Sequence, residues 1–332
     1  MKNLASPGQF GLPDPGMQDP MIGVSTMRKF LAMNFLLVIG LFLMAGCASD
    51  DSTDPPVPPR IPVVTQITDN TNFESNPNIS PDGEWILFES DATGNRDIYR
   101  MPVEGGTAEQ LTTNEAFDSA ASWSPDGQAI VFESERSGED VKDIYILDLS
   151  VPEAEPVALT HSGSSDGSPS WSPNNDFIVF ESDRDKSAGS DLWLVPVGGG
   201  DPQRLTTTED GFYCRTPCWS PDGGRVAFEG GREGLSAIYT VNNMGLDLLQ
   251  ITPDASYEGH PDWSPDGEEI AYESTKTGLS EIYAIAADGS GAPFQVTTSG
   301  GFWPAWSPDG TQIFYGSFGS SSANLWVVEV DW

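Results

Sequence analysis

The chain has 332 residues, which is enough for one large domain or two modest ones. It carries 15 Lys and Arg residues against 50 Asp and Glu residues, so no basic stripe is available to bind nucleic acid or anionic lipid. The 35 glycines, 27 prolines and 10% aromatic residues favour a turn-rich all-β protein over a disordered chain, and two histidines with three cysteines leave little material for metal or thiol chemistry.

The first 46 residues are interpreted as an upstream extension followed by an export signal. Residues 1–26 fit no export signal, whereas the segment from Met27 to Cys47 has a basic start, an apolar stretch over 30–44 and then Ala-Gly-Cys. This layout is that of a secretory signal peptide and predicts that Met27 is the true start. The ending LMAGC resembles the lipobox of bacterial lipoproteins, which implies that Cys47 is acylated. The alternative is a signal anchor, because about 17 apolar residues can just span a bilayer.

Residues 47–62 are predicted to form a tether. The stretch after Cys47, ASDDSTDPPVPPR, is polar and proline-rich and has no apolar periodicity. In the lipoproteins that it resembles, an Asp directly after the cysteine retains the protein in the inner membrane. Ala48 at this position implies an outer-membrane lipoprotein that faces the periplasm or the cell surface. Cleavage before Cys47 removes three basic and two acidic residues, which leaves 12 basic against 48 acidic residues, a charge of −36.

From residue 63 onward the chain repeats one unit six times. Each copy contains a turn tetrapeptide, SPDG in five copies and SPNN in one, and Trp precedes it in five copies. The tetrapeptides start at Ser80, Ser124, Ser172, Ser220, Ser264 and Ser307. A run of three apolar residues follows, then a variable polar loop, then a DIY-type tripeptide and a short segment that ends in threonine. Pro followed by Asp-Gly predicts a tight hairpin, and a run that is apolar on both faces predicts a strand that is buried on both sides.

Each unit therefore predicts four short antiparallel strands, A to D, and six units predict an all-β, six-bladed β-propeller. A lone D-type strand, VTQIT at 64–68, precedes the first A strand, and the last copy stops after its C strand, LWVVEVDW. The N-terminal strand is therefore predicted to complete the last blade. Closure of the ring over 63–332 in this way removes the edge strands that invite aggregation.

The order WSPDG, apolar strand, polar loop and IY resembles the TolB-type β-propeller family over essentially all of residues 63–332. The resemblance rests on six motifs in register and implies the propeller fold. The chain departs from TolB itself, which carries an extra α/β domain before its propeller, and no room for that domain is expected here. The partners of TolB are therefore not carried over to this chain.

A glutamate ends the predicted strand B in five of the six units, whereas blade six has Gly316. These residues are Glu89, Glu133, Glu181, Glu229 and Glu273. In four units a basic residue follows three positions later, and in blade one Arg96 comes later. The predicted ion pairs are Glu133–Arg136, Glu181–Arg184, Glu229–Arg232 and Glu273–Lys276. A buried strand-end carboxylate needs a partner, so these pairs would tie the B–C hairpins. The alternative is a ring of carboxylates that binds a cation.

Binding residues are expected on the face that carries the D–A and B–C loops, because the B–C loops differ in every blade while the A–B turns are nearly uniform. The D–A loops add a column of aromatic residues with acids beside it, and two further residues lie close to the predicted channel mouth. The candidates are Phe73, Glu74, Phe117, Asp118, Asp166, Tyr213, Tyr257, Glu258, His260 and Trp303. Aromatic and acidic groups together suit a cationic peptide or a sugar. The alternative is that the acids cap loop amides and the aromatics pack between blades.

Three further motifs bear on chemistry. Cys214 and Cys218 in an exported protein predict a disulfide, although the loop between them would have to turn. The stretch GSSDG at 163–167 matches G-x-S-x-G but leads into a strand, whereas a nucleophile elbow leads into a helix. Propeller-type oligogalacturonate lyases resemble this fold but use a histidine-rich metal cluster, and His161 and His260 are too few for one.

Together these features predict an exported, lipid-anchored propeller that acts as a non-catalytic binding module for envelope proteins or peptides. The expected ligand is a cationic protein or peptide segment, or a glycan, and the protein is expected to be a monomer without a cofactor. Nucleic acid is not expected as a partner, and the membrane is contacted through the lipid anchor only. The alternative is a calcium-assisted hydrolase or lyase at the channel mouth, because Asp, Glu and Asn oxygens suffice to bind Ca²⁺.

Overall fold

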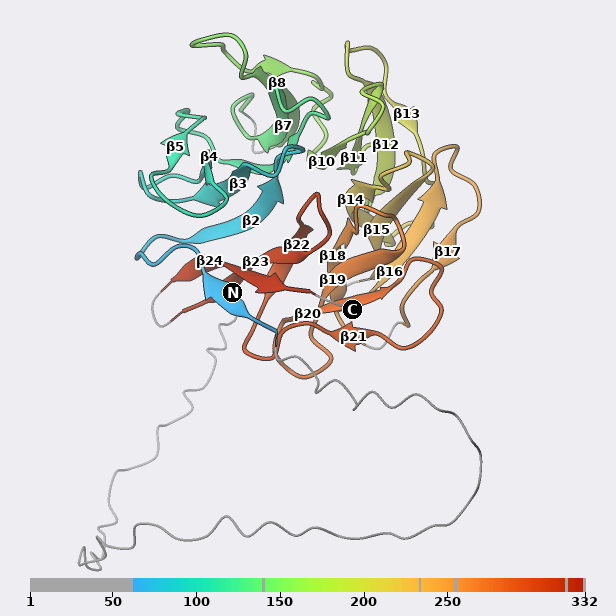
Figure 1. Ribbon diagram of the computed structural model, residues 1–332. Coiled ribbons are helices and arrows are strands. Elements are labelled where there is room, and N and C mark those ends of the chain that lie inside the picture. Colours follow the sequence, from blue (N-terminus) through green and yellow to red (C-terminus); the bar gives the residue numbers. More distant parts are fainter. Residues whose placement is uncertain (1–61, 139–140, 233, 254–255, 320–321, 331–332) are drawn as a thin grey trace, which may run out of the picture. The chain divides into compact units, whose positions relative to one another are not determined.

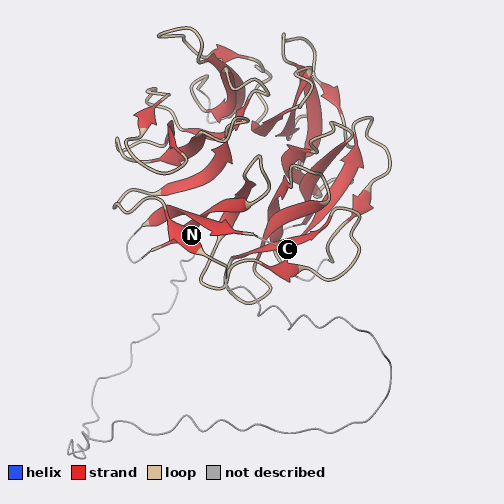
Figure 2. Cartoon of the chain, viewed as in Figure 1, coloured by secondary structure: helices blue, strands red, loops and turns tan. Residues whose placement is uncertain are grey.

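The computed structural model describes residues 62–332 except for 139–140, 233, 254–255, 320–321 and 331–332 (Figure 1). In this part of the chain every regular element is a strand, and the strands form six four-stranded antiparallel sheets (Figure 2). No helix among the described residues is long and apolar enough to cross a bilayer. The predicted export signal, the lipidation site at Cys47 and most of the tether lie outside the described residues.

Each sheet is one blade, and its A strand faces the axis of the ring. Blade one contains β2 (Glu74–Ile79), β3 (Trp85–Ser90), β4 (Asp97–Pro102) and β5 (Glu109–Gln110). Blade two contains β6 (Asp118–Trp123), β7 (Ala129–Ser134), β8 (Asp143–Asp148) and β9 (Val157–Ala158). Blade three contains β10 (Asp166–Trp171), β11 (Phe177–Ser182), β12 (Asp191–Pro196) and β13 (Gln203–Arg204).

The other three blades follow the same order. Blade four contains β14 (Tyr213–Trp219), β15 (Arg225–Arg232), β16 (Leu235–Asn242) and β17 (Leu249–Gln250). Blade five contains β18 (Glu258–Trp263), β19 (Glu269–Ser274), β20 (Glu281–Ala286) and β21 (Phe294–Gln295). Blade six contains β22 (Phe302–Trp306), β23 (Gln312–Phe318), β24 (Ala323–Glu329) and β1 (Val64–Gln66).

The ring closes as predicted, because the N-terminal strand β1 is the outer strand of blade six. It pairs with β24 in antiparallel register, with Val64 opposite Val328. The threonine that follows repeats a contact found in the other blades: the Thr68 hydroxyl accepts a hydrogen bond from the backbone N–H of Leu325 at 3.0 Å. In blade two the hydroxyl of Thr160 accepts the corresponding bond at 3.0 Å. The six-bladed propeller closed by its N-terminal strand is therefore confirmed.

The A–B hairpin is held by its own side chains. In blade two the Ser124 hydroxyl donates to Asp126 at 2.7 Å and accepts from the backbone N–H of Ala129 at 2.9 Å. Gly127 closes the turn at φ +68°, a conformation that costs glycine little. Because the same SPDG chemistry occurs in most copies, the sequence fixes the same register at each of these hairpins.

The hydrophobic core lies between neighbouring blades. The apolar run of strand B is buried; in blade two Ile130 and Phe132 are 0% exposed. They pack with Leu87 of blade one and with Trp123, whose indole N–H donates to the backbone oxygen of Asn78 in blade one at 3.2 Å. Since each core cluster is shared by two adjacent blades, the blades stabilise one another and leave a channel along the axis.

Candidate functional site

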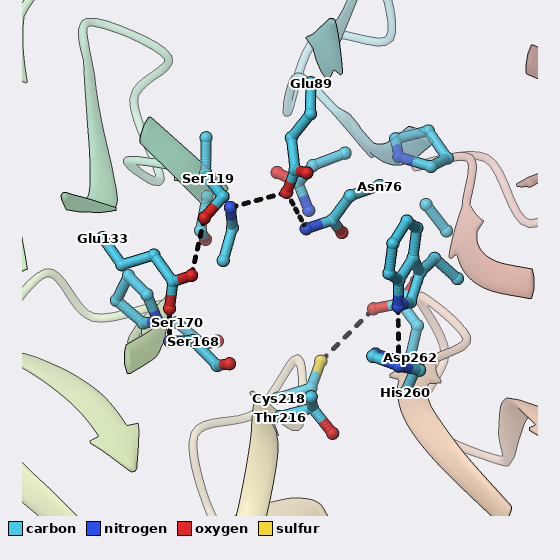
Figure 3. Close-up of a pocket in the computed structure, with 18 of the residues that line it drawn as sticks. Asn76, Glu89, Ser119, Glu133, Ser168, Ser170, Thr216, Cys218, His260 and Asp262 are labelled. Carbon is cyan, nitrogen blue, oxygen red and sulfur yellow. Dashed lines mark hydrogen bonds between the residues drawn. The ribbon is translucent and has the colours of Figure 1, made fainter. Parts of the chain in front are cut away.

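The A strands surround an axial channel with a cavity of about 300 Å³ (Figure 3). One residue in each A strand, three positions before the residue that precedes the turn tetrapeptide, has a positive φ and lines this channel. These residues are Asn76, Ala120, Ser168, Thr216, His260 and Trp303. Positive φ is uncommon outside glycine, and here it marks a bulge where the A–B register shifts in every blade.

In two blades the repeated glutamate bonds to the bulged residue of the next blade. Glu89 accepts a hydrogen bond from the backbone N–H of Ala120 in the next blade at 2.8 Å, and Glu133 accepts from the backbone N–H of Ser168 at 2.8 Å. The left-handed residue thus turns its amide toward the carboxylate of the preceding blade (Figure 3). In these blades the glutamate joins neighbouring blades at the channel wall, which is an architectural role.

The predicted ion pairs within the B–C hairpins are wrong for the arginines. Arg136 pairs with Asp118 at 2.7 Å, and its guanidinium lies 5.1 Å from the ring centroid of Phe132. Phe132 and Glu133 point to opposite faces of the strand, so a residue that stacks on the first cannot reach the second. The cation beside Glu133 is instead Lys142, at 2.6 Å.

The basic residues of blades three to five also have partners other than the predicted glutamates. Arg184 pairs with Asp166 at 2.6 Å and Arg232 pairs with Glu209 at 2.8 Å, while Lys276 lies 4.9 Å from the ring centroid of Tyr283. Only the pair in blade one is found as predicted, with Arg96 at 3.4 Å from Glu89.

Burial makes the carboxylates of this wall poor acids. Burial raises the pKa of Glu181 to about 7, with the neighbouring charge of Glu133 adding to the shift. Burial likewise raises the pKa of Glu229 to about 7, and it raises the pKa values of Glu89 and Glu273. At neutral pH Glu181 and Glu229 are therefore only partly ionised, because a carboxylate out of water is costly to ionise.

A second cavity of about 240 Å³ opens beside Glu181 between blades three and four. Its lining includes two cations, Lys142 and Arg215, and the guanidinium of Arg215 lies 4.1 Å from the ring centroid of Tyr213. This cavity and the axial channel share Lys142 in their walls. The loop face thus has two neighbouring recesses with charged walls.

Two hydrogen bonds between side chains lie in the channel wall formed by blades four to six. The Trp303 indole donates to Nε2 of His260 at 2.6 Å, and burial lowers the pKa of His260 to about 3. The Cys218 thiol donates to Asp262 at 3.2 Å, and burial raises the pKa of that carboxyl to about 6. The imidazole is therefore neutral, and its acceptor nitrogen is already used.

The predicted disulfide between Cys214 and Cys218 is absent, since both are free thiols. The two side chains belong to different interfaces. Cys214 is fully buried in the core cluster of blades three and four, whereas Cys218 lines the channel and packs against the cluster of blade five. The extended strand β14 between them holds the thiols apart, because no turn occurs there.

Most of the predicted loop-face residues lie outside the lining of the axial cavity. Glu74, Asp118, Asp166 and Glu258 are buried, with 0–5% of each exposed. Among the aromatics, Phe117 is 54% exposed, Tyr213 is buried, and Phe73 and Tyr257 are half-buried. Only His260 and Trp303 of the predicted set line the described axial cavity. Sequence reasoning did not single out Lys142, Arg215 and Asp262, because the residue type at each of these repeat positions changes from blade to blade.

Metal ligands do not converge in the part of the chain that the structure describes: no three His, Cys, Asp or Glu side chains there form a group able to hold a metal ion. His161 lies next to Asp143 at 3.6 Å with its side chain 81% exposed, and it is not part of the channel lining.

The sequence model of the TolB β-propeller domain matches residues 116–214 and 211–315. The chain belongs to the TolB β-propeller family. The Tricorn protease N-terminal β-propeller domain also matches residues 62–141. This TolB-type propeller is similar in structure to a protein from Agrobacterium tumefaciens assigned as TolB, with a TM-score of 0.63 and 22% identity over 81% of this chain and 97% of that one.

Other solved structures share the fold. TolB from Acinetobacter baumannii has a TM-score of 0.60 and 16% identity over 78% of this TolB-type chain and 63% of its own length. A gluconolactonase from Xanthomonas campestris has a TM-score of 0.61 and 15% identity over 81% of this chain and 90% of its own. A curated relative, an uncharacterized Agrobacterium fabrum protein, is 40% identical over 47 residues, which cover 14% of this chain and 16% of that protein. At these identities the solved structures establish the fold alone.

Proposed function

We propose that this TolB-type propeller is a non-catalytic binding module that takes a cationic protein or peptide segment at the loop-face mouth of its channel. The observation that carries the proposal is the excess of carboxyl groups over cations at this mouth. Five glutamates end the B strands around it, and among the described residues three cations act on them: Arg96, Lys142 and Arg215. An excess of carboxylates in a partly dry recess favours a cation supplied by a partner.

The size and walls of the recess suit a short segment of chain. A cavity of about 300 Å³ lies at the lower end of the range for ligand sites, so it accommodates one or a few side chains and not a folded domain. The B–C loops that border it differ in every blade, as binding loops on a rigid scaffold do. The partner would therefore insert a segment while its body rests on the loop face.

The export signal predicted at 27–46 supports a location in the cell envelope. With Cys47 acylated, the protein would be an outer-membrane lipoprotein and a monomer on its tether. The chain enters the propeller on the face that carries the A–B and C–D turns, because Val64, the first residue of β1, lies opposite Val328 near the end of a C strand.

Binding of a defined cationic probe tests the proposal. The full chain, purified in detergent, is titrated into fluorescently labelled hexalysine, and the fluorescence anisotropy is measured. We expect saturable binding, and we expect the double variant Glu181→Gln, Glu229→Gln to bind about tenfold more weakly. The matched control is Glu153→Gln, Glu155→Gln, which makes the same two substitutions at exposed positions after β8.

Two results would overturn the proposed site. One is that hexalysine fails to bind at low ionic strength, where attraction between opposite charges is strongest. The other is that the control variant weakens binding as much as the site variant does. In that case the attraction would come from the net charge of the protein and not from the channel mouth.

A further inference from the structure

Blade six interrupts the ring of glutamates with an aromatic side chain. Gly316 occupies the position of the glutamate and lies opposite Phe302 of the A strand. A Cβ on Gly316 would lie 2.3 Å from the Phe302 ring, so the ring packs directly on the glycine backbone. The carboxylate is therefore replaced by an apolar surface at this one sector of the mouth.

The Phe302 ring belongs to an aromatic track that runs from the channel to the loop face. Its centroid lies 5.2 Å from that of Trp303, which lines the channel, and 4.9 Å from that of Phe318. The Phe318 centroid in turn lies 6.4 Å from that of Phe73. Phe302 is 7% exposed, whereas Phe318 at the end of β23 is 70% exposed. The track thus begins in the channel wall and ends in a phenylalanine that faces solvent.

Phe73, beside Phe318, borders an ion pair and an exposed carboxylate. The Arg96 guanidinium lies 5.3 Å from the ring centroid of Phe73 and 3.4 Å from Glu89. The exposed Asp91 carboxylate accepts a hydrogen bond from the backbone N–H of Phe73 at 2.7 Å, so an anionic group and an apolar surface meet at the junction of blades six and one. Covering a large exposed phenylalanine with an apolar group removes apolar surface from water and so favours binding. An aromatic group adds a favourable ring-to-ring contact.

We propose that Phe318, supported by Phe302 and Phe73, forms a subsite for an aromatic or aliphatic side chain of a cationic peptide. The inference rests on the proposed function and narrows its ligand to a segment in which a basic residue lies next to an apolar one. The basic residue meets the glutamates while its neighbour covers the exposed ring. A neutral glycan could stack on Phe318 but would gain nothing from the carboxylates, so a peptide complements both surfaces.

Two labelled peptides of equal charge test this subsite: Lys-Phe-Lys-Phe-Lys-Phe and Lys-Ser-Lys-Ser-Lys-Ser. Anisotropy titrations of the full chain in detergent give both affinities. We expect the phenylalanine peptide to bind about fivefold more tightly, the factor expected for one aromatic contact. The variant Phe318→Ala should bring the ratio of the two affinities close to one. The control Phe294→Ala changes a residue that is 53% exposed on the outer strand of blade five and should keep the ratio.

The outcomes separate the subsite from the binding function. If both peptides bind the unaltered protein equally, or if Phe318→Ala keeps the ratio, the subsite is wrong while the cationic site stands. If Phe294→Ala also abolishes the ratio, the preference comes from general surface contact and the subsite is again wrong. If neither peptide binds, the proposed function and the subsite both fail.

Discussion

Replacing Glu181 with glutamine should flatten the pH dependence of folding stability between pH 5 and pH 8. The folded pKa of Glu181 is about 7, raised from 4.5 by burial and then by Glu133, and opposed by Arg215, Ser168 and Lys142. Between these two values the folded protein keeps a proton that the unfolded chain has lost. Stability is therefore highest at low pH in this window and falls as the pH rises toward 7.

The magnitude follows from the shift. A change of about 2.5 in pKa corresponds to at most about 3 kcal/mol lost from the free energy of unfolding between pH 4.5 and 7. The carboxylates of the turn tetrapeptides, such as Asp126, have lowered pKa values and titrate below this window, so they do not mask the effect. Urea unfolding at pH 5 and pH 8 measures the difference, and Glu181→Gln should lose most of the contribution of this group.

Binding should show the opposite dependence on pH. A peptide lysine pairs with the ionised carboxylate only, and it stays charged throughout because its pKa is about 10.4. For a group with a pKa of about 7, the ionised fraction rises by up to about 100-fold from pH 5 to pH 8, so hexalysine should bind more tightly at pH 8.

Two results of the unfolding experiment would refute the reasoning. One is that the free energy of unfolding of the unaltered protein rises with pH in this window. The other is that the Glu181→Gln variant shows the same dependence of that free energy on pH as the parent.

Three further predictions concern the fold. Gly316→Ala should cost about 1–3 kcal/mol because the new methyl group meets the Phe302 ring, and Phe302→Leu should remove most of that cost, as measured by urea unfolding of the single and double variants. Asp118→Ala should lower the free energy of unfolding by about 3 kcal/mol, because it leaves the guanidinium of Arg136 buried without its carboxylate partner. A coupling energy of zero in a double-mutant cycle with Arg136→Met would contradict this pairing. Thr68→Val should lower the free energy of unfolding by about 1 kcal/mol through loss of the closing hydrogen bond, and an unchanged denaturation midpoint would argue against it.

The repeat period made the fold predictable, but it did not predict the partners of individual side chains. Six copies of one turn and one buried strand define the strand order, and the lone strand at 64–68 then defines the closure. The pairing of Glu133 with Arg136 was wrong because proximity in sequence ignored the opposite faces of Phe132 and Glu133. The bulge at the channel could not be found either, since its left-handed residues share no residue type, from Ala120 to Trp303.

The glutamates of this column use their two carboxylate oxygens differently. In Glu89, Oε1 accepts hydrogen bonds from Asn76 and from the backbone of Ala120, while Oε2 accepts none from the described residues and lies near Arg96. In Glu181, Oε1 accepts from Ser168 while Oε2 is buried and accepts none from the described residues. In these two glutamates one oxygen bonds within the blade or to the next one, and the other is buried without a hydrogen-bond donor from the described residues. In Glu133 both oxygens accept, one from Ser119 and the other from the backbone N–H of Ser168. The corresponding residue of blade six, Gly316, has no acceptor side chain and packs against the Phe302 ring.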